Sequence, residues 1–192
     1  MAATRSIDAI SAVIATGAQI TKTTTQVANL TGANTYTGIT TVSAGVLNIQ
    51  NANALGTTAA RTSVTSGAAL QIQGGITTAA EALTLNGTGI TTTGALRNIS
   101  GDNTYAGLVT LGAATRINSD AGTLTLSNAG TITGATRGLT VGGAGNTTIA
   151  SIIGTTTGTL TKDGAGTLEL TGANTLSGPT TVNGGTLQIS GG

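Results

Sequence analysis

Few residues in this chain have side chains that could catalyse a reaction. The carboxylates are Asp8, Glu81, Asp102, Asp120, Asp163 and Glu169. Enzymes that cleave polysaccharides need two carboxylates, or a carboxylate beside Arg or Lys, within one groove. A polysaccharide-degrading function would therefore require Asp102, Asp120 and Arg116 to converge.

Three arginines have a spacing that indicates a surface column. Arg97, Arg116 and Arg137 follow one another at intervals of 19 and 21 residues, and Asp102 and Asp120 lie 18 apart. If the chain repeats with a similar period, these side chains stack on one face and form a contact surface for a polysaccharide or an anion. The alternative is that the scattered charges only keep an otherwise neutral surface soluble.

Several classes of site are disfavoured by what the sequence lacks. The chain has no His and no Cys, so the commonest general base, thiolate ligands and disulfides are missing. The glycine-rich segments 141–146 and 163–166 fit neither a phosphate-binding loop nor a calcium-binding repeat, and we interpret them as turns. We predict no catalytic residue, no cofactor and no metal site.

Charge and hydropathy exclude two kinds of partner. Charged residues make up 7% of the chain and the net charge is +1, too few for a basic surface that binds nucleic acid. No apolar run approaches the roughly 18 residues of a membrane span. The N-terminal apolar stretch, residues 10–14, has a counterpart at 149–153, which favours a strand of the fold over a signal peptide.

The composition predicts an all-β fold with a narrow core. Gly contributes 31 residues and Pro one, while Phe and Trp are absent and Tyr36 and Tyr105 are the only aromatic residues. Abundant Thr, Val and Ile favour strands, and Gly favours the turns between them. A wide core usually contains aromatic rings, so Leu, Ile, Val and Ala must fill this one.

The sequence repeats itself. The segments TGANTYTG at 31–38, SGDNTYAG at 100–107 and TGANTLSG at 171–178 share one motif. When residues 20–49 are aligned with 160–189, 15 of the 30 positions are identical. Repeats of this kind stack on one another and bury a continuous core.

A shorter pattern assigns faces to the strands. Apolar-polar-apolar triplets such as Leu70-Gln71-Ile72 and Leu168-Glu169-Leu170 recur along the chain, and this alternation indicates strands with one buried face. Each unit of about 70 residues divides into about three coils of about 23 residues. We predict a right-handed parallel β-helix of roughly 8–9 coils, with a sandwich or barrel as the alternative. The domain is 1–192, with related units at approximately 10–50, 51–118 and 119–192.

The repeated motif places one asparagine at the same position in each copy. These are Asn34, Asn103 and Asn174, and we predict that they hold turns by bonding to the backbone of their own or a neighbouring coil. Tyr36 and Tyr105 also occupy equivalent positions, which indicates a structural role. A flat array of Thr hydroxyls, as in ice-binding solenoids, is a weaker alternative because Thr-x-Thr has no fixed register in the sequence.

The segments 31–49 and 164–189 resemble the autotransporter passenger-associated β-strand repeat. The middle copy departs from that pattern because residues 108–117 lack its Thr-Thr-Val step. The resemblance implies a parallel β-helix of an exported bacterial protein, located outside the cell or at its surface. It implies a non-catalytic structural or adhesive role.

The two ends of such a solenoid suggest a further partner. The last predicted strand, 186–189, has no recognisable cap after it, and residues 20–49 nearly duplicate 160–189. We therefore expect the chain to bind a further copy of itself head to tail, forming filaments, or to continue into more repeats. A surface polysaccharide is the other expected partner.

Overall fold

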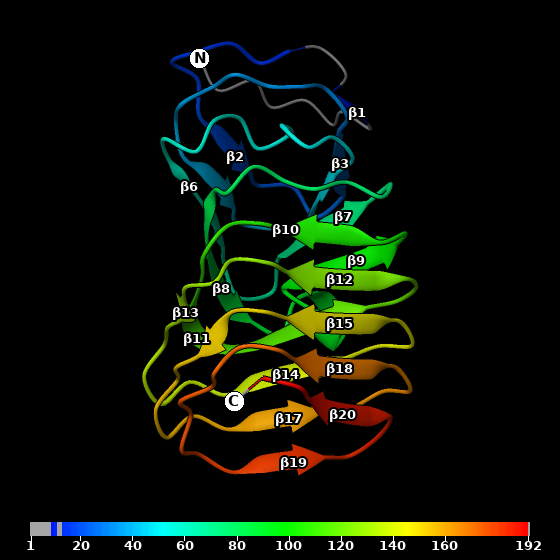
Figure 1. The fold of residues 1–192 in the computed structure, drawn as a ribbon. Helices are drawn as coiled ribbons and strands as arrows, with labels where there is room; N and C mark the ends of the chain where they lie inside the picture. Colours follow the sequence, from blue (N-terminus) through cyan, green and yellow to red (C-terminus); the bar gives the residue numbers. More distant parts are fainter. Residues whose placement is uncertain (1–8, 11–12, 192) are drawn as a thin grey trace.

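The chain winds into a parallel β-solenoid, seen from the side in Figure 1. The computed structural model describes residues 9, 10 and 13–191. Every described strand pair is parallel, and strands within a stack pair with strands of the neighbouring coils. The prediction of an all-β parallel solenoid of about eight coils is confirmed; the right-handed sense and the single-domain division into three units stay predictions.

The strands form three stacks, which we call faces 1, 2 and 3. Face 1 contains β1 (Ala9–Ile10), β3 (Val27–Leu30), β5 (Val46–Ile49), β7 (Ala69–Gln73), β9 (Leu96–Ser100), the second half of β11 (Val109–Ser119), β14 (Leu139–Gly142), β17 (Leu160–Lys162) and β19 (Thr180–Val182). Face 2 contains β2 (Ile20–Lys22), β4 (Thr40–Val42), β6 (Arg61–Val64), β8 (Ala82–Gly87), the first half of β11, β13 (Thr131–Ile132) and β16 (Ile152–Ile153). Face 3 contains β10 (Asn103–Tyr105), β12 (Thr123–Leu126), β15 (Asn146–Ile149), β18 (Thr167–Leu170) and β20 (Thr186–Ile189).

The core runs along the inside of these faces, as the triplets predict. Leu70 and Ile72 are fully buried, whereas Gln71 between them is half-buried on the outer surface. In register, Leu47 lies on Leu70 and Leu70 on Leu96, so identical or similar side chains stack from coil to coil. The interval between stacked residues ranges from 19 (Val27 to Val46) to 28 (Gly87 to Thr115).

Both tyrosines lie inside the solenoid with 0% exposure. The Tyr36 hydroxyl bonds to Thr40 at 2.6 Å, and the Tyr105 hydroxyl donates to the Glu81 carbonyl oxygen at 2.9 Å. Gly56 makes room for Tyr36, because a Cβ there would lie 3.0 Å from the tyrosine ring, and its φ of 80° also favours glycine. The core holds the Tyr36 ring where the next coil has a glycine, whereas Tyr105 stacks in register on Leu126.

The repeat changes face halfway along the solenoid. The segment β2–β3 aligns in sequence with β17–β18, yet β2 lies on face 2 and β17 on face 1. The change occurs at β11, whose residues 109–111 pair with β8 on face 2 and whose residues 117–119 pair with β9 on face 1. From there, β14, β17 and β19 continue face 1, and β13 continues face 2 through the bridge between Thr110 and Thr133. The second half of the repeats is thus rotated by one face relative to the first.

An insertion precedes this change of face. The loop 88–94, between β8 and β9, contains a short 3-10 turn, η1 (Ile90–Thr92). The loop closes on itself, because the Gly94 N–H donates to the Thr88 carbonyl oxygen at 2.9 Å. Thr91 and Thr92 both have positive φ, 46° and 62°, a conformation that is costly for β-branched residues. The loop connects β8 on face 2 to β9 on face 1, and Thr91 and Thr92 within it are exposed.

Candidate functional site

Face 1 carries the polar residues with planar side chains. In register, an outward row runs through Asn29, Asn48, Gln71, Arg97 and Asn118. We call the following ten residues, which form this row and its immediate partners, the planar polar strip: Asn29, Asn48, Gln50, Gln71, Gln73, Arg97, Arg116, Asn118, Asp120 and Asp163.

Amide groups link the first part of the strip along the solenoid axis. Asn48 Nδ2 donates to Gln73 Oε1 at 3.1 Å and to Gln71 Oε1 at 3.3 Å. Gln50 Nε2 donates to Asn48 Oδ1 at 2.9 Å. Each coil is therefore joined to the next by side chains as well as by the backbone ladder.

Ion pairs link the second part of the strip. Arg97 Nε donates to Asp120 Oδ2 at 2.9 Å, and Asn118 Nδ2 donates to Asp120 Oδ1 at 2.8 Å. Arg116 Nη2 then donates to Asn118 Oδ1 at 3.1 Å. Arg116 also makes a bidentate pair with Asp163, with both N–O distances 2.7 Å.

The Arg116–Asp163 pair spans an intervening coil. Arg116 lies on β11 and Asp163 follows β17, while β14 lies between them. Gly142 of β14 leaves the gap open, because a Cβ there would lie 2.0 Å from Asp163 Oδ1. The hydrogen bond from Arg116 lowers the pKa of Asp163, so this carboxylate is charged at neutral pH.

The predicted arginine column is only partly assembled. Arg97 and Arg116 lie on face 1 and each is paired with a carboxylate. Arg137 is exposed in the loop before β14, and it takes part in neither of the two ion pairs that the described residues form. The paired guanidinium groups are less available to an external anion than a free column would be. Anion binding by this column stays a prediction.

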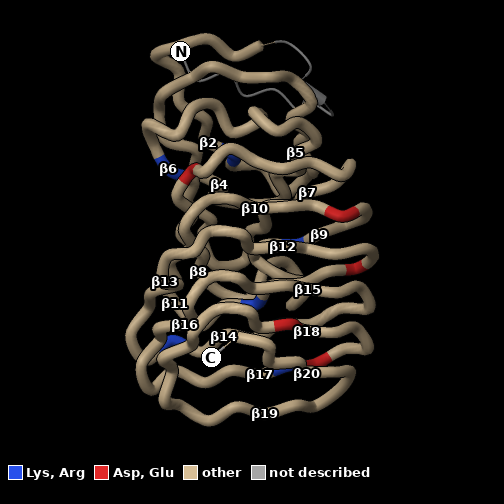
Figure 2. Tube along the Cα trace, viewed as in Figure 1, with Lys and Arg blue, Asp and Glu red and all other residues tan. Residues whose placement is uncertain are grey.

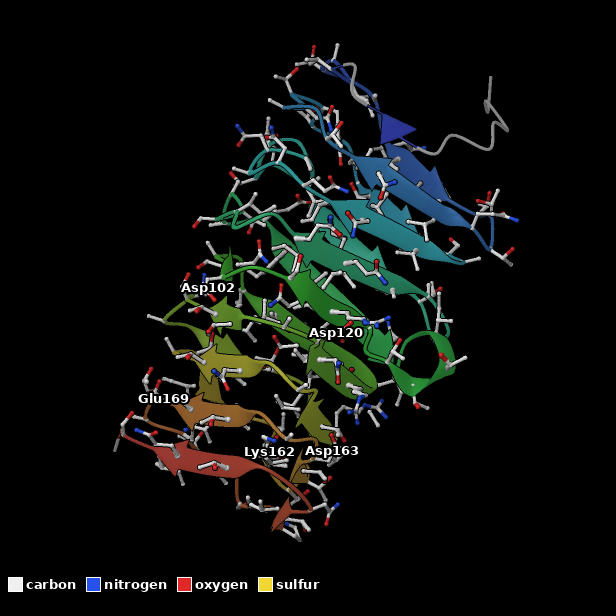
Figure 3. All side chains as sticks on the ribbon, turned by 90° about the vertical axis from the view of Figure 1, so that its right-hand side faces the viewer. Asp102, Asp120, Lys162, Asp163 and Glu169 are labelled. Carbon is white, nitrogen blue, oxygen red and sulfur yellow. The ribbon has the colours of Figure 1, made fainter. Side chains whose placement is uncertain are left out.

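The residues of the enzyme alternative do not converge. Figure 3 shows Asp120 and Asp163 along one face and Asp102 and Glu169 at a distant edge. Asp102 accepts a hydrogen bond from the Thr123 N–H, and Asp120 reaches Arg116 only through Asn118. Asp8 lies outside the described residues. Among the described residues, no three acidic groups gather as a metal site would require.

The three motif asparagines each bridge to the preceding coil. Asn34, Asn103 and Asn174 accept hydrogen bonds from the N–H groups of Ile14, Ile76 and Ile153, at 2.9, 2.8 and 2.8 Å. Asn103 makes the most contacts, because its Nδ2 also donates to Asn98 Oδ1 at 2.7 Å and to the Ser100 carbonyl oxygen at 2.8 Å.

These contacts predict different costs for two equivalent substitutions. Asn103→Ala is expected to lower the free energy of unfolding by about 2–3 kcal/mol, because the Ile76 N–H and the buried Asn98 Oδ1 each lose the hydrogen bond that Asn103 makes with them. Asn174→Ala is expected to cost about 1 kcal/mol, because Asn174 is half-buried and makes fewer bonds. Chemical denaturation of the two variants tests this, and an equal cost would contradict the assigned contacts.

Both lysines of the chain are buried, and the sequence analysis missed this. Lys22 and Lys162 occupy equivalent repeat positions and are 7% and 2% exposed. Lys162 Nζ donates to the carbonyl oxygens of Asp163, Gly164 and Gly184, the last in the next coil. Lys22 Nζ likewise reaches the Ala44 carbonyl oxygen of the next coil at 3.2 Å. Burial lowers the pKa of both amines. Their equivalence under the 140-residue alignment was the signal that could have identified them.

The final described coil has an apolar recess of ≈460 Å³. Its lining includes Leu160, Leu170, Leu176 and Leu187. Val182 and Ile189 at the same end are 49% and 66% exposed. Among the described residues, no further coil packs on the end of the solenoid that β19 and β20 form.

One family matches the chain. The passenger-associated-transport-repeat matches residues 20–49, 117–137 and 160–189. The chain carries passenger-associated transport repeats. Searches of curated proteins and of solved structures gave no match. The resemblance noted in the sequence is thereby confirmed for its first and last copies, while the middle match begins after the 100–107 motif.

The positions of the three repeats agree with the change of face. The first passenger-associated repeat begins on face 2 at Ile20, whereas the second and third begin on face 1 at Ile117 and Leu160. As a region of passenger repeats, the chain belongs to the secreted or surface-exposed class of proteins. No helix among the described residues has the length and hydropathy to cross a membrane.

Proposed function

We propose that this chain is a non-catalytic β-solenoid segment that serves an exported passenger as an extended stalk and adhesive surface. The observation that carries the proposal is the uninterrupted parallel ladder, in which the outward acids are dispersed or paired with arginine. A stalk requires length and resistance to unfolding, and both follow from a backbone ladder that continues through every coil. A hydrolase or lyase requires acids that share one groove, and Asp102, Asp120 and Arg116 do not.

Two measurements on the whole chain test this function. Small-angle scattering should give an elongated monomer or oligomer, and incubation with neutral and acidic polysaccharides should give no cleavage products. Turnover that Asp102→Ala or Asp120→Ala abolished would overturn the non-catalytic role. A compact, roughly spherical particle would contradict the stalk.

The exposed coil formed by β19 and β20 favours a second role in assembly. The recess and the exposed Val182 and Ile189 make an apolar surface bordered by unpaired strand edges. Coils of this chain already stack in register on that repeat, as β18 does on β20, so we infer that a further coil docks there, supplied by a second copy or by more repeats of a longer chain. Sedimentation at rising concentration should show end-to-end oligomers, which Ile189→Asp should abolish. A monomer at all concentrations would overturn docking by a second copy.

A further inference from the structure

The outer surfaces of faces 1 and 2 differ in chemistry although they arise from the same repeats. The outward row of face 2 consists of hydroxyl residues in register, namely Thr21, Thr41, Ser63, Thr84, Thr110 and Thr133. The equivalent row of face 1 consists of amides and a guanidinium, as described above for the planar polar strip. Of these two faces, face 1 therefore carries most of the planar polar groups.

Planar groups suit one class of ligand. An amide, carboxylate or guanidinium presents two hydrogen-bonding atoms side by side in one plane, which matches the adjacent hydroxyls of a sugar ring. Successive coils repeat these groups at about 4.8 Å along the axis. A polymer with regularly spaced hydroxyls, laid along the axis, would therefore meet planar groups on the coils from β3 to β11, mainly at Gln71 and Arg97, because Asn48 and Asn118 of the row are 2% and 7% exposed.

The charge of the strip indicates the charge of the ligand. Its two arginines are balanced by Asp120 and Asp163, both within hydrogen-bonding distance of a guanidinium. Figure 2 shows that charged residues are sparse over the described coils, and beside the strip Lys162, buried next to Asp163, adds a single positive charge. A polyanion gains little from such a surface, whereas an uncharged polymer loses nothing to repulsion.

The loop 88–94 borders the strip. Thr91 and Thr92 are exposed there, and Thr93 contacts Arg97, whose Nη1 lies 3.4 Å from the Thr93 hydroxyl oxygen. The corresponding connection between β4 and β5 has only the three residues 43–45. The longer loop therefore adds hydroxyl groups beside the strip at Arg97.

We propose that the planar polar strip binds an uncharged, hydroxyl-rich polysaccharide along the solenoid axis. The proposal rests on the adhesive role proposed above and names its ligand class. Gln71 and Gln73 are the residues to test, because they are half-buried on the outer surface and their side-chain oxygens accept hydrogen bonds from the Asn48 amide.

Affinity electrophoresis of the whole chain in gels containing amylose, dextran, mannan or alginate tests the proposal. At least one of the three neutral polymers is expected to retard the chain, and alginate is not. The double variant Gln71→Ala/Gln73→Ala should weaken the retardation about tenfold. The matched double variant Thr41→Ala/Ser63→Ala, on face 2, should leave it unchanged, with circular dichroism showing that both variants fold.

Each other outcome overturns the proposal. Absence of retardation by all three neutral polymers, retardation by alginate alone, or an equal loss in the two double variants would each do so. The proposed stalk function fails by different results, namely cleavage products or a compact particle. An elongated, inactive chain that binds none of these polymers would therefore refute the ligand and leave the stalk standing.

Discussion

Leu168→Ala is expected to lower the free energy of unfolding by about 2–4 kcal/mol. Leu168 is 0% exposed and lies between Thr147 and Leu187 of the adjacent coils, so truncation leaves a cavity that its neighbours cannot fill. The cost includes both the lost burial and the cavity.

Gln188→Ala is the matched control, because Gln188 stacks in register on the outward Glu169 of the same face. It is exposed, and its substitution should change the free energy of unfolding by less than about 0.5 kcal/mol. Urea denaturation of both variants decides the matter. Similar losses would mean that the inward and outward sides of face 3 are assigned wrongly.

The second large effect concerns pH and comes from Glu81. This side chain is 2% exposed, and only its Oε1 has a partner, the Thr62 hydroxyl at 3.0 Å. Burial raises the pKa of Glu81 from 4.5 to about 7. Tyr105 is buried as well, and its own burial, together with the negative charge of Glu81, raises the pKa of its hydroxyl.

Because the folded-state pKa of Glu81 lies above the unfolded one, the folded chain binds more protons between these values. Stability from this group is therefore fully present below about pH 4.5 and is lost as the pH rises through about 7. The difference corresponds to about 3 kcal/mol. The chain has no His, whose titration would otherwise overlap this pH range.

Glu81→Gln should remove that dependence. The amide oxygen still accepts the Thr62 hydrogen bond but does not ionise, so the variant should be more stable than the parent at pH 8 and nearly independent of pH from 5 to 8. Thermal denaturation across that range, with the parent chain alongside, provides the measurement. A parent chain whose stability does not fall between pH 5 and 8 would show that Glu81 is not held in a dry environment.

The sequence predicted the features that depend on local alternation and on repetition. The Leu70-Gln71-Ile72 triplet identified both the strand and its buried side, because period-two alternation is a property of the strand itself. The motif asparagines were identified because the same position recurs in all three copies.

Features that depend on the relation between distant coils were not predictable. The change of face occurs within the eleven-residue strand β11, which has no repeat counterpart from which the change could be inferred. The burial of Lys162 and Glu81 was not predicted, since it depends on carbonyl and hydroxyl groups that adjacent coils supply. The partners of Arg116 were hidden for the same reason, because Gly142 opens the path to Asp163 from a different coil.

The change of face can be tested directly, because the chain has no native Cys. The structure pairs Thr110 with Thr133, both outward on face 2, and it places Thr140 on face 1 next to Arg116. A solenoid without the change of face would instead stack β14 on the first half of β11, with Thr140 beside Thr110.

Oxidation of two double-cysteine variants therefore measures which arrangement the chain adopts. Neighbouring Cα atoms of paired parallel strands are about 4.8 Å apart, within the range of a disulfide. Thr110→Cys/Thr133→Cys is predicted to crosslink readily within one chain, and Thr110→Cys/Thr140→Cys is predicted to stay reduced. The opposite result, with the second variant crosslinked and the first reduced, would contradict the change of face and with it the continuous planar polar strip on face 1.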